Sequence, residues 1–288
     1  MSIRYVALRC EERDDDRSRQ STTFYWTQAD TMAGIPLGSE PPQQTEEEEA
    51  AVTAALAEAR ENGVGPDPAL PQDLVFDLQL VLNGFSDCRG EDGQLYLDAY
   101  LRAYSELNKF LQLLGTVFNF VSHDIQKKVT ILQCYRKGGA GDYYYSIQSM
   151  IEYEQENNLL TSSDRQSGSR TLLRLHRGLE FISGFMAELH KASDTAGLGS
   201  PSSELYGRTL AKHHNWVLAK TVGAVLLMMP NKQTIIERVI LGSKPMTGGT
   251  MGVREHNEAL MPKVIEVMNS VYNLTQKLYE DYNILDLP

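Results

Sequence analysis

From Leu74 to the end of the chain, apolar residues recur every three or four positions. This spacing puts apolar side chains on one face of an α-helix, because a helical turn takes about 3.6 residues. One such face runs from Leu74 to Phe85, a longer one from Leu97 to Leu114, and another from Leu260 to Leu278. No segment shows sustained alternation of apolar and polar residues between turn residues, as a half-buried strand would. The pattern therefore predicts an all-α domain without strands.

Clusters of Gly, Ser and Pro separate the predicted helices. The loop 161–168 precedes a helix that runs to about Lys191, and the glycine-containing segment 242–252 has no periodicity and is predicted to be a loop. Asn231 follows Pro230 and is a residue type that caps helix N-termini. The remaining predicted helices cover residues 124–135, 143–157 and 204–228.

The first 72 residues differ from the rest of the chain. They contain the acidic runs Asp14–Asp16 and Glu46–Glu49, six prolines, and little apolar periodicity. They hold six Lys or Arg against fourteen Asp or Glu, a net charge of −8, whereas residues 73–288 carry only −3. Such composition is typical of disordered segments. We therefore expect a disordered acidic tail over 1–72 and a folded domain over 73–288.

The overall charge and the cysteine content exclude several classes of protein. A net charge of −11 argues against nucleic acid as a partner, because phosphate backbones require clustered cations. Cys10, Cys88 and Cys134 are too few and too scattered for a disulfide framework or a zinc site, so we expect no metal, no cofactor and a reducing compartment. No apolar run approaches the roughly 20 residues that span a bilayer, and the N-terminus is too polar for a signal peptide. We expect a soluble, cytoplasmic protein.

The segment from Ser167 to Leu179 carries the most informative charge pattern. Arg170, Arg174 and Arg177 are spaced to share one helix face within an otherwise apolar pattern. Guanidinium groups one turn apart repel each other unless an anion bridges them, and a phosphate suits their fork-shaped donors. A solvated basic stripe remains the alternative from this helix alone.

Two further segments bear on how the arginine segment is interpreted. They are FNFVSHDIQKKV, from Phe118 to Val129, and LAKHHNWV, from Leu210 to Val217. Together with the arginine segment and the chain ending up to Pro288, they resemble the glycolipid transfer protein superfamily, and within it the branch that carries ceramide-1-phosphate. The resemblance covers about Leu74 to Pro288. It implies a two-layer helical sandwich that encloses a sphingolipid in an apolar pocket.

The resemblance also implies a role for individual residues. Asp124 falls on the position whose carboxylate accepts hydrogen bonds from the lipid amide, and Lys128 on a position that contacts the head group. Arg170 and Arg174 match the arginines that bind the phosphate, and His214 matches the histidine that bonds the amide carbonyl. Without the resemblance, Asp124 and Lys128 would be an ordinary surface ion pair worth about 0.3–0.5 kcal/mol.

Two of these positions favour phosphate over sugar. The glycolipid-selective members carry Asn where this chain has Lys128, and a sugar-stacking Trp where it has Arg174. The chain departs from the pattern at Asn215, which replaces the usual Pro between His214 and Trp216, so the resemblance does not fix the local backbone there.

A lipid carrier also needs an apolar lining and a surface that contacts membranes. We expect membrane contact from Trp216, Tyr104 and the run Tyr143–Tyr145, although that run could equally pack in the core. Candidates for the lining are Phe118, Phe120, Val121, Ile125, Leu172 and Leu175.

Three functions are consistent with the sequence. The first is non-enzymatic transfer of a sphingolipid, most simply ceramide-1-phosphate, between membranes that the protein contacts transiently. The second is a lipid-responsive regulatory adaptor that binds the same ligand and uses the acidic tail to recruit a partner. The third, a phosphohydrolase, is disfavoured because the predicted site has one carboxylate and no second acid, nucleophile arrangement or metal cluster.

Overall fold

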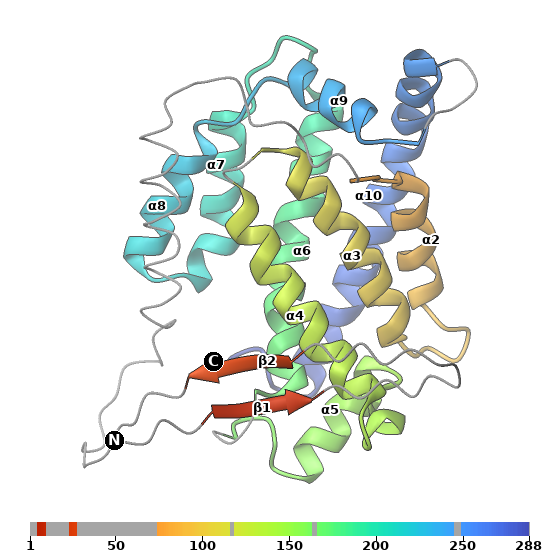
Figure 1. The fold of residues 1–288 in the computed structure, drawn as a ribbon, viewed down its shortest axis with the longest axis vertical. Coiled ribbons are helices and arrows are strands. Elements are labelled where there is room, and N and C mark those ends of the chain that lie inside the picture. Colours follow the sequence, from red (N-terminus) through yellow and green to blue (C-terminus); the bar gives the residue numbers. More distant parts are fainter. Residues whose placement is uncertain are drawn as a thin grey trace.

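A computed structural model describes residues 5–9, 23–27, 74–115, 118–162, 166–244 and 249–287. Helices dominate residues 74–287 (Figure 1). The α-helices are α2 (Leu78–Cys88), α3 (Leu97–Leu113), α4 (Asn119–Lys137), α5 (Ile147–Glu156), α6 (Gly168–Lys191), α7 (Gly199–Arg208), α8 (Trp216–Leu226), α9 (Lys232–Leu241) and α10 (Gly249–Asp281), and the short 3₁₀ helices are η2 (Gly141–Tyr144) and η3 (Leu210–His213).

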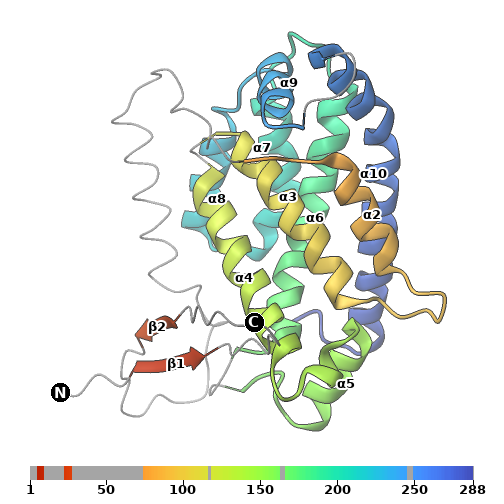
Figure 2. The same cartoon turned by 45° about the vertical axis from the view of Figure 1, so that its right-hand side comes forward.

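The helices form two layers. In one layer α3 packs between α2 and α4, and in the other α6 packs between α7 and α10, with α8 beside α7 (Figure 1). The layers meet where α4 contacts α6 and where α2 contacts α10. Helices α5 and α9 lie at opposite ends of the bundle, as Figure 2 also shows. The predicted all-α, two-layer architecture is confirmed for this part of the chain.

The inner helix faces build one apolar core. Tyr100 and Tyr104 of α3 stack at 5.4 Å between ring centroids, and Phe85 of α2 meets Tyr100 edge-on at 5.7 Å. Gly84 allows α2 to approach α3, since a Cβ there would lie 2.9 Å from the Cβ of Ala103 and 3.0 Å from its backbone nitrogen. None of the helices in the described ranges is both long enough and apolar enough to cross a bilayer.

Several predicted boundaries are wrong. Helix α4 begins at Asn119 rather than at residue 124, and α5 begins at Ile147 rather than at residue 143. The helix predicted over 204–228 is divided into α7, η3 and α8. The division occurs because Asn215 takes an extended backbone conformation and its side chain accepts a hydrogen bond from the Leu218 N–H at 2.9 Å, which starts a new helix. The loop predicted over 242–252 ends earlier, because α10 begins at Gly249, whereas the cap predicted at Asn231 is confirmed by its bond from the Thr234 N–H.

The prediction that the chain has no strand is wrong for ten residues near the N-terminus. Strand β1 (Tyr5–Arg9) pairs antiparallel with β2 (Thr23–Thr27), with Tyr5 opposite Thr27. Their sequences, YVALR and TFYWT, are rich in aromatic and β-branched residues, which favour strands. Each strand is only five residues long, which is too short for its residue pattern to be recognised within the surrounding acidic composition.

Candidate functional site

Helix α4 presents an aspartate and a lysine one turn apart. The Lys128 Nζ donates a hydrogen bond to the Asp124 carboxylate. Only 9% of the Lys128 side chain is exposed, whereas 47% of the Asp124 side chain is. The ammonium group is thus held partly inside the protein by its carboxylate, so this is not the fully solvated ion pair of an ordinary helix surface.

Helix α6 presents three arginines on one face. Burial lowers the pKa of Arg170 and of Arg177, and the positive charge of Arg174 lowers both further. Arg177 donates a hydrogen bond from Nη2 to the backbone oxygen of Leu285 at 2.8 Å. Arg174 is half-buried and makes no hydrogen bond or ion pair within the described ranges of the chain. The guanidinium of Arg174 therefore lies between two like charges with its donors open to an anion.

The N-terminus of α6 is held by a buried carboxylate that the sequence analysis missed. Glu154 of α5 accepts hydrogen bonds from the N–H groups of Gly168 and Ser169, at 2.7 and 2.9 Å, and from the hydroxyl groups of Ser167 and Tyr144, at 2.6 and 2.9 Å. These N–H groups are therefore already satisfied, and an anion at this site would meet the arginine side chains rather than the helix terminus. No local pattern marks Glu154, because it lies 13 residues before Ser167.

His214 joins the site from the end of η3. Burial lowers its pKa to about 4, with Lys128 and Arg177 lowering it further and Asp124 opposing them. These charges act on His214 because they lie around it, so α4, α6 and η3 converge here. The imidazole is neutral at pH 7. Its Nδ1 lies 2.6 Å from the hydroxyl oxygen of Tyr206, a second residue that the sequence analysis missed.

The neighbouring His213 has a different environment. Burial also lowers its pKa to about 4, but the charges acting on it are those of Arg177, Lys212 and the other histidines, and Asp124 is not among them. Of the two histidines, His214 is the one placed against the Asp124–Lys128 pair. The structure thus connects all five predicted residues through contacts or electrostatic interactions: Asp124, Lys128, His214, Arg174 and Arg170, with Arg177 between His214 and Arg174.

Apolar side chains surround these polar groups. The predicted lining residues Phe118, Ile125, Leu172 and Leu175 are buried in the core, and Phe120 and Val121 are partly buried. Phe118, Val121, Ile125, Leu172 and Leu175 belong to the apolar core or pack against it, so a cavity between them would need these helices to move apart.

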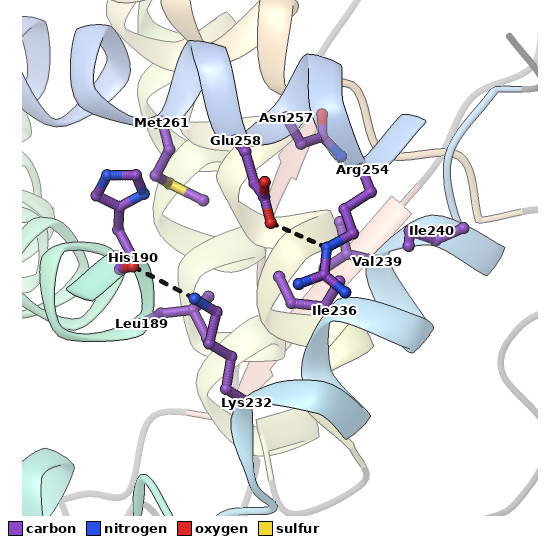
Figure 3. Close-up of a pocket in the computed structure, with 10 residues that line it drawn as sticks. All are labelled: Leu189, His190, Lys232, Ile236, Val239, Ile240, Arg254, Asn257, Glu258 and Met261. Carbon is purple, nitrogen blue, oxygen red and sulfur yellow. Dashed lines mark hydrogen bonds and ion pairs between the residues drawn. The ribbon is translucent and has the colours of Figure 1, made fainter. Parts of the chain in front are cut away.

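A small pocket lies at the other end of α6, between α6, α9 and α10 (Figure 3). It has a volume of about 30 Å³, far below the roughly 300–1,000 Å³ of sites that bind small molecules. Leu189, Val239 and Met261 line it, and Lys232 beside them donates to the backbone oxygens of His190 and Ala192. Leu189 is 15 residues after Arg174 on α6, a distance of about 22 Å along the helix. This pocket is therefore separate from the arginine face.

Three of the aromatic residues predicted to contact membranes are exposed. Trp216 is 74% exposed at the first position of α8, two residues after His214. Tyr143 and Tyr145 are also exposed, and Tyr143 stacks on Tyr153 at 4.5 Å between ring centroids.

Two other tyrosines do not lie at the surface. Tyr104 is completely buried and donates its hydroxyl proton to the backbone oxygen of Leu175, so its prediction as a membrane-contacting residue is wrong. Tyr144 is also buried, where it donates to Glu154. In both cases a core partner satisfies the hydroxyl, and the apolar ring then packs inside.

Fold and site together define a two-layer helical protein with a partly buried cationic site set among apolar side chains. In the part of the chain that the structure describes, no three His, Cys, Asp or Glu side chains are grouped to hold a metal ion. The sequence model of the glycolipid transfer protein family matches residues 95–240. This chain belongs to the glycolipid transfer protein family.

Its relatives include several ceramide-1-phosphate transfer proteins. The rat protein is 33% identical over an alignment of 219 positions, which covers 74% of this chain and 97% of that protein. The crystal structure of the mouse protein in its apo form superposes with a TM-score of 0.66 at 32% identity, over 74% of this chain and all of the mouse chain. The human protein in complex with 12:0 ceramide-1-phosphate gives a TM-score of 0.64 at 31% identity, over the same shares.

Proposed function

We propose that this protein binds ceramide-1-phosphate and transfers it between membranes without chemical change. The observation that carries the proposal is Arg174, a half-buried guanidinium between Arg170 and Arg177 whose donors face no partner within the described ranges. A dianionic phosphate offers acceptors to Arg174 and carries the negative charge that suits three neighbouring guanidinium groups.

The head group determines which lipid is chosen. Burying each CH₂ away from water yields about 0.8 kcal/mol, but the lipid leaves a bilayer that is already apolar, so chain transfer is nearly neutral. Hydrogen bonds to charged groups contribute about 1.5–3 kcal/mol each and differ between head groups. Arg174 and the buried Lys128 favour a phosphate, since neither offers the flat apolar face on which a sugar ring stacks.

Asp124 and His214 recognise the amide group of the sphingolipid. The exposed part of Asp124 accepts a hydrogen bond from the amide N–H, and the neutral ring of His214 donates one to the acyl carbonyl. Glycerol-based phosphatidic acid has no such N–H, so this pair separates sphingolipids from glycerolipids.

The relatives and the surface support transfer. Proteins named as ceramide-1-phosphate transfer proteins cover the same 74% of this chain, and one of them is solved with that lipid. We infer that Trp216, exposed beside His214, inserts into the membrane interface while lipid is exchanged, since an indole ring suits that boundary. On this proposal the protein works in the cytoplasm, has no catalytic residue and uses no metal or cofactor.

Vesicle-to-vesicle transfer tests the proposal. Donor vesicles carry ceramide-1-phosphate and a neutral glycosylceramide at equal levels, acceptors carry neither, and mass spectrometry identifies the lipids recovered. We expect intact ceramide-1-phosphate to move in strong preference. Bound lipid without transfer would instead indicate an adaptor, and released inorganic phosphate would indicate an enzyme.

Substitutions then test the phosphate site. Arg170→Leu and Arg174→Leu should each lower transfer about 10- to 100-fold, since each removes a charge-assisted contact. Arg102→Leu is the matched control, because Arg102 is an exposed arginine on α3 whose one ion pair among the described residues, to Asp87, spans 3.8 Å. Transfer close to the parent rate by both α6 variants, or equal transfer of both lipids, would refute the phosphate assignment.

A further inference from the structure

The side chain of Tyr206 is fixed against the predicted ligand-binding histidine. Its hydroxyl oxygen lies 2.6 Å from Nδ1 of His214, eight residues further along the chain. The ring is 2% exposed and meets the ring of Phe181 on α6 edge-on, at 6.2 Å and 89°. Because α7 packs on α6, these contacts hold the phenol beside the imidazole.

The direction of this hydrogen bond decides where the imidazole carries its proton. A neutral imidazole has one N–H and one bare nitrogen, and a partner on Nδ1 fixes which is which. Burial raises the pKa of Tyr206, so the phenol keeps its proton. A phenol donates more strongly than it accepts, because its oxygen lone pair is delocalised into the ring, whereas the bare imidazole nitrogen is a good acceptor. The short O–H···N bond therefore runs from Tyr206 to Nδ1 and leaves the hydrogen on Nε2.

We propose that Tyr206 is a positioning residue that holds His214 as the Nε2–H tautomer, and so makes the ring a donor toward an acyl carbonyl. The inference rests on the proposed function and extends it to specificity. A ring held in this form donates a hydrogen bond to a phosphate lipid that carries an N-acyl group, and therefore binds that lipid more tightly. It offers no matching contact to a phosphate lipid whose amine is free.

The other groups around His214 are consistent with this assignment. Asp124 and Lys128 come from α4 and Arg177 from α6, and neither cation can accept a proton from the ring. Asp124 can only accept, so it also favours an N–H on the ring atom that faces the site. Tyr206 is the one donor in the described residues that bonds Nδ1.

The ¹⁵N NMR spectrum of the histidine side chains tests the tautomer without any lipid. In the parent protein the Nδ1 of His214 should show the shift of a hydrogen-bonded bare nitrogen, and Nε2 that of an N–H. Tyr206→Phe keeps the ring and its contact with Phe181, and should move the Nδ1 resonance and populate the Nδ1–H form. Tyr100→Phe is the control, since its buried hydroxyl has no partner within the described residues. An unchanged Nδ1 resonance in Tyr206→Phe would overturn the proposal.

A double-mutant cycle tests the consequence for binding. Tyr206→Phe should weaken binding of short-chain ceramide-1-phosphate about three- to tenfold, which is the usual worth of one hydrogen bond. In a His214→Ala background the same substitution should have no further effect, and binding of sphingosine-1-phosphate, which has no acyl carbonyl, should not change. Losses that add in the His214→Ala background, or that are equal for both lipids, would show a merely structural role. If the parent protein bound neither lipid, the proposed function would be refuted, and the NMR experiment would still test the tautomer of His214.

Discussion

The carboxylate that begins α6 offers the sharpest test of how the arginine face is held. In Glu154→Gln the side chain keeps its size but loses its charge and one acceptor. In the parent, Oε1 accepts from Gly168 N at 2.7 Å and Tyr144 Oη at 2.9 Å, and Oε2 accepts from Ser167 Oγ and Ser169 N at 2.6 and 2.9 Å. Each carboxylate oxygen thus serves one backbone N–H. Whichever way the new amide is turned, its NH₂ group faces one of these N–H donors.

The cost follows from that geometry. One buried N–H left without an acceptor costs about 1–3 kcal/mol, and removing a negative charge from a helix N-terminus costs about 0.3–2 kcal/mol. We therefore expect the free energy of unfolding to fall by about 2–4 kcal/mol. For a domain of this size the melting temperature should drop by about 5 to 15 °C.

Thermal unfolding followed by circular dichroism at 222 nm measures this change. Glu156→Gln is the matched control, since Glu156 ends the same helix but is exposed, and its melting temperature should stay close to that of the parent. A Glu154→Gln protein whose melting temperature lies within about 2 °C of that of the parent would refute the reasoning. It would mean that the α6 terminus is satisfied in another way.

Three further predictions follow from other parts of the molecule. Asp124→Val should remove the discrimination between ceramide-1-phosphate and phosphatidic acid while both still bind through the arginines; a variant that still discriminates contradicts the role of Asp124. Burial lowers the pKa of His176 to about 4, below the usual 6.5, so the unfolded chain takes up a proton first and stability is lost as the pH falls from about 6.5 to 4. Urea unfolding should show this loss, up to about 3 kcal/mol from His176 alone, and His176→Phe should make it shallower because the stack on Tyr272 remains while the titration does not; an equal slope in both proteins argues against it. Finally, a chain starting at Pro71 should fold and should transfer lipid to anionic vesicles at least as fast as the full chain does. The difference in transfer rate should fade once the screening length falls below about 10 Å. Loss of folding or of transfer on truncation would place residues 1–70 in the working domain.

Local patterns predicted most of the helical architecture. The spacing of apolar residues located α3, α6 and α10, because a periodic face records directly which side of a helix is buried. The cap at Asn231 was also legible, since it depends on residues three apart in the sequence. By contrast, the same residue type at Asn215 was read as a departure from a motif, when it is the cap that begins α8.

What the sequence could not reveal depends on distant partners. Tyr104 combines an apolar ring with a polar hydroxyl, as residues at a membrane interface do. Only the position of Leu175, 71 residues away, shows that this hydroxyl is satisfied inside the core. Glu154 and Tyr206 likewise act across helix boundaries, so no helical period connects them to Ser167 or His214. The charged side chains of the candidate site were predicted from family motifs, and the residues that contact them were not.

The mutual repulsion of Arg170, Arg174 and Arg177 has a consequence for how long the molecule survives. Each folded molecule keeps these charges together at a cost that the unfolded chain does not bear. A bound phosphate cancels that cost only in the folded state, so the ligand adds to stability by mass action, by about 2.7 kcal/mol at a hundred times its dissociation constant. Molecules without cargo would then unfold more often and be cleared sooner by proteases. If the proposed function holds, the abundance of the protein would follow the supply of its lipid ligand.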